Sequence, residues 1–199
     1  RIGIITAASV PPTDASEAAN DSRENSVTDG RYYARLFTRF GAAATYRVPL
    51  DVSQSQQWSG DTYGADRVDD PKVLSRVDRM TGFFFGGGDQ LRYVDVLQDC
   101  STGSCTDQPV LAAVRARLAG GAVVAGSSAG DTIMQASPMV VRGESWTAWA
   151  NGVKDDDAAF TPGAVVRNEG GFGFFDTGLL DSHVGERGRQ GRLVRIAMY

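Results

Sequence analysis

Residues 123–134 read VVAGSSAGDTIM, a run of small apolar residues that leads directly into a Gly-x-Ser-x-Gly motif. At a nucleophile elbow, a strand turns so sharply into a helix that the residues two before and two after the nucleophile must be small. Gly126 and Gly130 meet this requirement, and helix-forming residues follow them. The stretch predicts a strand, a tight turn and a helix. Ser128 is then either a nucleophile at a helix N-terminus or one more serine in a glycine-rich bend.

The rest of the chain alternates between short apolar runs and segments with helical periodicity. The runs predict strands at 1–9, 45–50, 82–88 and 122–126, and the periodicity predicts helices at 29–41, 70–80 and 108–121. Residues 10–30 read as a loop with room for one helical turn, residues 51–70 as a polar surface excursion, and residues 142–170 as irregular. This alternation predicts a parallel sheet with helices on both faces, in a single α/β domain over residues 1–199.

The composition is that of an ordinary globular protein. The 199 residues are 42% hydrophobic, and the net charge of −4 argues against a nucleic-acid partner, whose binding surface is usually basic. No apolar run reaches the 18 residues of a membrane helix, so we expect no membrane partner. The chain opens at Arg1 inside a predicted strand, and the lack of a leader therefore says nothing about its compartment.

The chain has two cysteines, Cys100 and Cys105, in the sequence DCSTGSC. A zinc site needs about four ligands, and one distant histidine cannot complete it, so we expect no metal site. The cysteines form either a short-loop disulfide, which we favour, or two free thiols. A disulfide would favour a secreted or periplasmic setting over a cytoplasmic one.

A serine nucleophile needs a base, and His183 is the single histidine of the chain. A lone histidine can also be structural or simply exposed. If Ser128 acts through an imidazole, however, His183 is the only candidate. The serine precedes the histidine by 55 residues. That interval is short for an α/β-hydrolase, and the order differs from those of chymotrypsin-like and subtilisin-like enzymes.

Three stretches together resemble the signature blocks of the cyanophycinase-like serine peptidases, the S51 family that also contains aspartyl dipeptidase. These are FFFGGGDQLR at 83–92, AGSSAGDTIM at 125–134 and DSHVGERGRQGRL at 181–193. The arginines four, six and nine residues after His183 point to the cyanophycinase branch. The resemblance implies a three-layer α/β/α sandwich similar to the class I glutamine amidotransferases, with a mostly parallel sheet and no cofactor.

The resemblance also implies catalytic roles. Ser128 would be the nucleophile and His183 the general base and then the general acid. The backbone N–H groups of Gly88 and Ala129 would form the oxyanion hole. A glycine at position 88 is chemically sensible, since a substrate carbonyl must come close to the backbone there.

The third member of the triad is an acidic residue 15–20 positions after the serine in this family. Glu144 lies 16 positions after Ser128 and is the expected match. Asp131 is the alternative, but it lies one helical turn after the serine, where the family usually has alanine. The run Asp155–Asp157 reads as a solvated loop.

Cyanophycin is a polyaspartate backbone with arginine attached to each side-chain carboxylate, so its binding site must hold carboxylates and a guanidinium. Arginine forks bind carboxylates in bidentate fashion, and Asp181 could bind a guanidinium. The arginine run could instead be a solvated basic helix face. The substrate contacts implied by the resemblance are Gln90, Asp181, Ser182, Arg187, Arg189 and Arg192.

The leading hypothesis is therefore a serine hydrolase that cleaves β-linked Asp-Arg units of cyanophycin or related isoaspartyl peptides. An aspartyl dipeptidase and a catalytically silent ligand-binding homologue remain as alternatives. Ser182 and Val184 depart from the family pattern and leave the substrate open. Family members continue for several dozen residues beyond the arginine block, so we expect a C-terminal companion segment that completes the sheet, and a homodimer.

Overall fold

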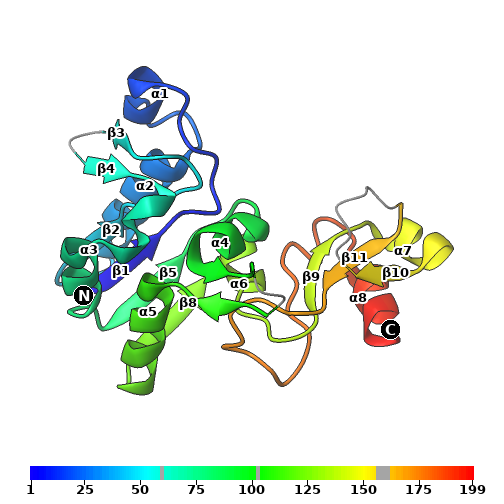
Figure 1. The fold of residues 1–199 in the computed structure, drawn as a ribbon. Coiled ribbons are helices and arrows are strands. Elements are labelled where there is room, and N and C mark those ends of the chain that lie inside the picture. The colour runs from blue at the N-terminus through cyan, green and yellow to red at the C-terminus, as the bar shows by residue number, and fades with distance from the viewer. Residues whose placement is uncertain (59–60, 102–103, 156–161) are drawn as a thin grey trace. The chain divides into compact units, whose positions relative to one another are not determined.

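The computed structural model describes residues 1–58, 61–101, 104–155 and 162–199 (Figure 1). Contacts within the chain divide it into two compact units, Arg1–Gly126 and Ser127–Tyr199. Each unit has its own sheet. The assignment of the whole chain to one domain stays a prediction.

The first unit is built on a parallel sheet. Its four strands are β1 (Ile2–Ile5), β2 (Thr45–Val48), β5 (Gly82–Phe85) and β8 (Val123–Gly126). They are hydrogen-bonded in the order β2-β1-β5-β8, and every neighbouring pair is parallel. The four predicted strands and the α/β fold class are confirmed.

Helices cover both faces of this sheet. The helices of this unit are α1 (Ala15–Ala19), α2 (Ser26–Arg39), α3 (Pro71–Val77), α4 (Gln90–Leu97) and α5 (Pro109–Ala119), with a 3-10 helix η1 (Ala65–Asp69). Tyr33 of α2 packs against Phe84, with ring centroids 4.6 Å apart, and Tyr93 of α4 packs against Phe85 at 5.5 Å. Because successive strand residues point to opposite faces, α2 and α4 lie on opposite sides of β5.

Two helices of the first unit differ from the sequence-based prediction because of a capping side chain, and α3 ends at Val77, three residues before the predicted end. Helix α2 begins at Ser26, three residues earlier than expected, because the side chain of Asn25 accepts hydrogen bonds from the N–H groups of Val27 and Thr28. Helix α4 was not predicted. It begins after Asp89, whose carboxylate accepts a hydrogen bond from Leu91 N–H at 3.0 Å.

The segment predicted as a polar excursion contains η1 and a hairpin of β3 (Gln56–Trp58) and β4 (Asp61–Tyr63). A second hairpin, β6 (Gln98–Asp99) and β7 (Thr106–Asp107), flanks the two cysteines. Cys100 and Cys105 are joined, so the predicted disulfide is confirmed.

The second unit carries a smaller, mixed sheet. Its elements are α6 (Ala129–Thr132), β9 (Met139–Arg142), α7 (Ser145–Asn151), β10 (Val153–Asp155), β11 (Ala164–Arg167) and α8 (Gln190–Ala197). The strand order is β10-β11-β9, with β10 parallel and β9 antiparallel to β11. In the described part of residues 142–170, the prediction of an irregular region is therefore wrong, since α7, β10 and β11 lie there. Asp155 ends β10 and is exposed, whereas residues 156–157 lie outside the described residues.

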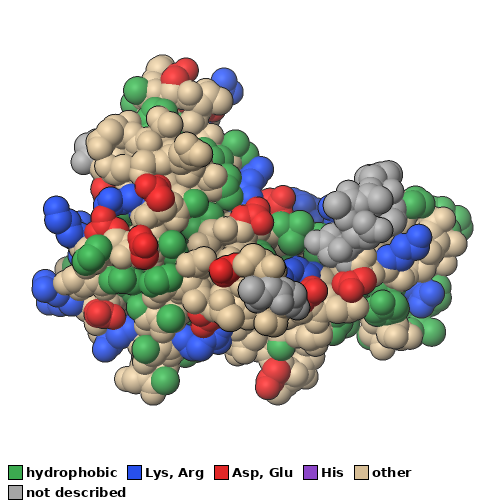
Figure 2. All heavy atoms as spheres, in the orientation of Figure 1, with side chains coloured by type: hydrophobic (Ala, Val, Ile, Leu, Met, Phe, Trp, Pro, Cys, Tyr) green, Lys and Arg blue, Asp and Glu red, His purple; other side chains and the backbone are tan. Residues whose placement is uncertain are grey.

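The surface gives two further observations. On the face of the first unit shown in Figure 2, basic and acidic side chains are interspersed rather than segregated. Among the helices of the described ranges, none is long and apolar enough to cross a membrane.

Candidate active site

Ser128 is the N-cap residue of the short helix α6, directly after β8. Its backbone has φ 56° and ψ −120°, a conformation that a residue with a Cβ rarely adopts. Among the described residues, Ser128 and His183 are the non-glycine residues with positive φ. Such strain costs about 1–3 kcal/mol per residue and clusters at functional sites. The two residues that the sequence paired as nucleophile and base are thus also the two strained ones.

The structure brings the side chains of Ser128 and His183 together. Nε2 of the imidazole lies 2.8 Å from Oγ of Ser128, within hydrogen-bond distance. The other ring nitrogen, Nδ1, lies 2.6 Å from Oε1 of Glu186. The imidazole therefore bridges a hydroxyl and a carboxylate, and its side chain is 28% exposed.

This arrangement determines which ring nitrogen of His183 carries the proton. The hydrogen bond from His183 is the main cause that holds the pKa of Glu186 below its ordinary value, so the carboxylate is ionised and can only accept. Nδ1 must then carry the proton in the neutral ring. Nε2 is left with a lone pair that accepts the Ser128 hydroxyl, which is the arrangement a general base requires.

Glu186 was not among the residues that the sequence predicted. It comes next to His183 because the chain turns there: Arg187 N–H donates to the carbonyl of His183 at 3.0 Å, and Arg189 N–H donates to that of Val184 at 2.9 Å. Residues three apart on such a turn are neighbours. The spacing of three between His183 and Glu186 is the signal that could have found this carboxylate.

Glu144, the predicted third triad member, lies at the exposed N-terminal end of α7, where its N–H donates to Thr147 Oγ1 at 3.2 Å. In this structure the carboxylate bonded to His183 is that of Glu186, and a catalytic role for Glu144 stays a prediction. Asp131, the weaker alternative, is half-buried in α6. Burial, followed by the negative charge of Asp181, raises the pKa of the Asp131 carboxyl.

Two of the predicted substrate contacts, Asp181 and Arg192, are bonded to each other. Arg192 Nε donates to Asp181 Oδ2 at 2.7 Å, and Nη2 donates to Oδ1 at 2.5 Å, a bidentate pair. Only 1% of the Asp181 side chain and 4% of the Arg192 side chain is exposed. The remaining Arg192 nitrogen, Nη1, donates to the carbonyl of Gly143 at 2.6 Å.

The other residues of the arginine block lie around this pair. Arg189 Nη1 donates to the backbone carbonyl of Ser182 at 2.8 Å and lies 3.5 Å from Asp181 Oδ1. Burial, followed by the charge of Arg192, lowers the pKa of Arg189. Arg187 is exposed. Of the predicted substrate contacts on this segment, Arg187 is thus exposed to solvent. The side chains of Asp181, Arg189 and Arg192 are bonded to other groups of the protein.

A buried glutamine, which the sequence analysis also missed, anchors the segment before Asp181. Gln135 is 2% exposed. Its Nε2 donates to the carbonyl of Gly178 at 2.9 Å, and its Oε1 accepts from Leu180 N–H at 2.6 Å. Both ends of the amide are satisfied, so the side chain joins the stretch just after α6 to the segment that leads to His183.

Gly88 and Gln90 lie in the first unit, while Ala129 lies in the second. Gly88 has φ 133°, and a Cβ there would come within 2.2 Å of the carbonyl oxygen of Ala8, so only glycine fits. Gln90 is the first residue of α4. Their predicted roles, and that of Ala129 in an oxyanion hole, stay predictions.

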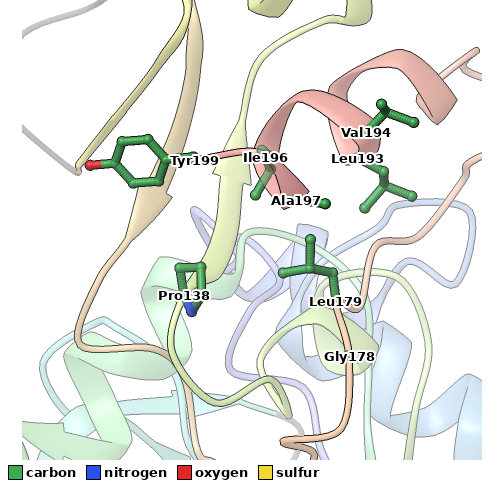
Figure 3. Close-up of a pocket in the computed structure, with 8 residues that line it drawn as sticks. All are labelled: Pro138, Gly178, Leu179, Leu193, Val194, Ile196, Ala197 and Tyr199. Carbon is green, nitrogen blue, oxygen red and sulfur yellow. The ribbon is translucent and has the colours of Figure 1, made fainter.

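An apolar groove of about 690 Å³ opens beside α8 in the second unit (Figure 3). In Figure 3, Leu179 and Pro138 face the helix that carries Leu193 and Ile196. None of the predicted site residues lines it, so it is not part of the Ser128–His183 arrangement. Its lining residues are Pro138, Gly178, Leu179, Leu193, Val194, Ile196, Ala197 and Tyr199.

Metal chemistry has no evident centre in the part of the chain that the structure describes. No group of three or more histidine, cysteine, aspartate or glutamate side chains is arranged there to hold a metal ion.

Comparison with solved structures finds a chain of similar fold. The chain is similar to a peptidase from an acI-B1 actinobacterium, with a TM-score of 0.52 over 93% of this chain and 55% of the other, at 15% sequence identity. At that identity the likeness shows the fold alone.

Among curated proteins, the chain is similar to the cyanophycinases of Trichormus variabilis and of a Nostoc species. Each is 30% identical over 175 residues, which is 87% of this chain and 47% of the relative. The chain thus spans about half the length of the curated relatives it matches. No family model matches the sequence.

Proposed function

We propose that this chain is a serine-type peptidase in which Ser128 is the nucleophile and His183 the general base. The observation that carries the proposal is the 2.8 Å contact between His183 Nε2 and Ser128 Oγ, with a carboxylate on the opposite ring nitrogen. A nucleophile, a base and an acid that orients the base are the three parts of a serine hydrolase, whatever their order in the chain.

The proposed reaction runs in two halves. His183 accepts the proton of Ser128 as Oγ attacks the substrate carbonyl, and the resulting imidazolium then protonates the leaving amine. An acyl-enzyme on Ser128 remains. Water, deprotonated by the same imidazole, attacks this ester and releases the acid with the serine restored.

Glu186 would act through the imidazole rather than on the substrate. Its carboxylate holds Nδ1–H, keeps the ring in the tautomer that leaves Nε2 free, and stabilises the imidazolium that forms during the reaction. The backbone N–H of Ala129, next to the nucleophile, is the proposed donor to the developing oxyanion, with Gly88 N–H as the second donor that the family resemblance implies.

The proposed substrate is the β-linked Asp-Arg unit of cyanophycin or a related isoaspartyl peptide. The two cyanophycinases that match 87% of the chain support this choice. The exposed Arg187 is available to a substrate carboxylate, which an arginine fork can bind in bidentate fashion. The homodimer and the C-terminal companion segment stay predictions.

The test compares release of products from cyanophycin, from a soluble β-Asp-Arg dipeptide and from Asp-Xaa dipeptides. Ser128→Ala is expected to abolish turnover, and the matched control is Ser127→Ala, which removes the neighbouring exposed hydroxyl. Turnover of Asp-Xaa dipeptides alone would favour an aspartyl dipeptidase. Full turnover in Ser128→Ala, or none of any substrate by the unaltered chain, would contradict the proposal, and the second outcome would favour a silent homologue.

A further inference from the structure

We propose that the Asp181–Arg192 ion pair positions His183 for the reaction, and that neither side chain binds substrate. The inference rests on the proposed function, since it assigns a role relative to the general base. It also replaces the family-derived expectation for these two residues, which made both of them substrate contacts.

The first argument is that every side-chain nitrogen and oxygen atom of the pair is already hydrogen-bonded within the protein and that the pair is buried. Both carboxylate oxygens of Asp181 accept from Arg192, and the third guanidinium nitrogen of Arg192 donates to Gly143 O. With 1% and 4% of the two side chains exposed, a substrate could reach neither group without breaking the pair. Leaving one partner of a buried pair uncompensated is strongly unfavourable.

The second argument is the position of Asp181, two residues before His183. Arg192 belongs to α8, and its Nη1 also reaches the turn between β9 and α7 at Gly143. The backbone N–H of Arg192 donates to Ser145 Oγ at 3.1 Å, and that hydroxyl donates to Gly188 O at 2.5 Å. The pair therefore ties the histidine segment to α8 and to the turn before α7.

The third argument is the backbone of His183 itself, whose φ is 55°. A strained residue keeps its conformation only when the surrounding structure over-determines it. Gln135 fixes the chain at Gly178 and Leu180, and the ion pair fixes it at Asp181. These contacts hold the approach to His183, while the turn that brings Glu186 to Nδ1 follows it.

The positioning role and the substrate role predict different kinetics. Loss of a substrate contact raises KM, whereas a base moved by about 1 Å costs up to about a hundredfold in rate. We therefore expect Asp181→Asn to lower kcat on the soluble β-Asp-Arg dipeptide by about 10–100-fold, with KM changed by less than about twofold. Arg192→Lys keeps the charge but loses the bidentate fork, so it should fall between Asp181→Asn and the unaltered chain.

The matched comparison is Arg187→Ala, which removes an exposed arginine of the same block. It should raise KM and leave kcat nearly unchanged. Two readouts need no natural substrate. One is the rate at which a fluorophosphonate labels Ser128. The other is the imidazole ¹⁵N spectrum, which reports His183 alone because the chain has a single histidine.

Slower labelling and a changed imidazole spectrum in Asp181→Asn, with circular dichroism unchanged, would support the proposal. Unchanged labelling with a raised KM would overturn it in favour of a substrate contact. If Asp181→Asn fails to fold, Arg192→Lys carries the same comparison. If the unaltered chain is not labelled at all, the proposed function fails. The imidazole spectrum then decides the positioning role: a changed spectrum supports it, and an unchanged one overturns it.

Discussion

The two units of this chain differ in what is buried inside each of them. In Arg1–Gly126, four parallel strands carry large apolar side chains into a core, as in the edge-to-face contact of the buried rings of Phe85 and Tyr93. In Ser127–Tyr199 the apolar cluster around Val140 and Val166 is small, and the same unit contains the buried ion pair of Asp181 and Arg192.

This difference bears on which kind of contact fixes the distances and angles of the side chains in a site. Apolar burial is non-directional and supplies most of the stability of a domain, but it sets side-chain angles loosely. A bidentate ion pair fixes distance and direction, yet its net contribution to stability is small because both charges lose their hydration. The Asp181–Arg192 pair, in which both side chains are buried, lies in the unit that contains Ser128 and His183, whereas the bidentate Arg115–Asp107 pair of the first unit is partly exposed.

The largest effect should come from removing the chemistry of the second unit. Ser128→Ala and His183→Ala should each lower kcat by about 10³-fold or more, and the double variant should lose little beyond either single one, because the two groups act as a unit. Single-turnover kinetics on the β-Asp-Arg dipeptide measure this. Losses that multiply in the double variant would show that the two residues act separately.

The next effect should come from the core of the first unit. Phe85 is fully buried, and Phe85→Ala should lower the free energy of unfolding by about 3–5 kcal/mol through lost transfer energy and a cavity. Urea unfolding measures the change. The fluorophosphonate labelling rate of the variant, at a temperature where it stays folded, serves as the readout of the other unit. If the labelling rate falls together with the free energy of unfolding, the core of the first unit also determines the reactivity of Ser128. The proposed contrast between the two units would then be wrong.

A smaller effect distinguishes two carboxylates within the second unit. Glu186→Gln should lower kcat/KM by about tenfold to a hundredfold. This is less than for a buried triad acid, because 70% of the Glu186 side chain is exposed and water screens its charge. Glu144→Gln is the matched variant and should have little effect. The reverse ranking would restore Glu144 as the third member.

The pH dependence of this pair has a defined sign. The pKa of Glu186 is lowered in the folded protein, so its contact with His183 is fully present above the ordinary glutamate range and is lost as pH falls through the lowered value. The ratio of kcat/KM between the unaltered chain and Glu186→Gln should therefore fall towards one as pH drops through the range in which Glu186 protonates. A ratio that stays the same down to about pH 3 would contradict this assignment.

The smallest effect should come from Asp131. Burial and the charge of Asp181 raise its pKa, so the ionised form penalises folding above that value and the penalty disappears as pH falls below the ordinary aspartate range. Asp131→Asn should raise the Tm at pH 7 by about 1–2 °C, discounted for the partial exposure of this group. Thermal unfolding at pH 7 and pH 3 measures it. An equal gain in Tm at pH 7 and at pH 3 would exclude the charge of Asp131 as its cause.

Much of the first unit could be predicted from the sequence because its signals are local. Alternating strands and helices, Pro71 at a helix start and the glycines at strand ends are each read from a few neighbouring residues. The start of α2 was placed too late because a capping side chain, Asn25, outweighed the apolar pattern. Helix α4 was missed for a similar reason, since its N-cap Asp89 follows a glycine run that suggested a loop.

The sequence by itself determined the parallel sheet, the sharp turn at Ser128 and, because the chain has one histidine, the only imidazole that could serve it. Only the tertiary structure decided which carboxylate meets that imidazole and that Asp181 and Arg192 bind each other. The physical reason is that strand and helix formation depends on near neighbours. The partner of a charge, in contrast, depends on which groups the folded backbone brings within about 3 Å and shields from water.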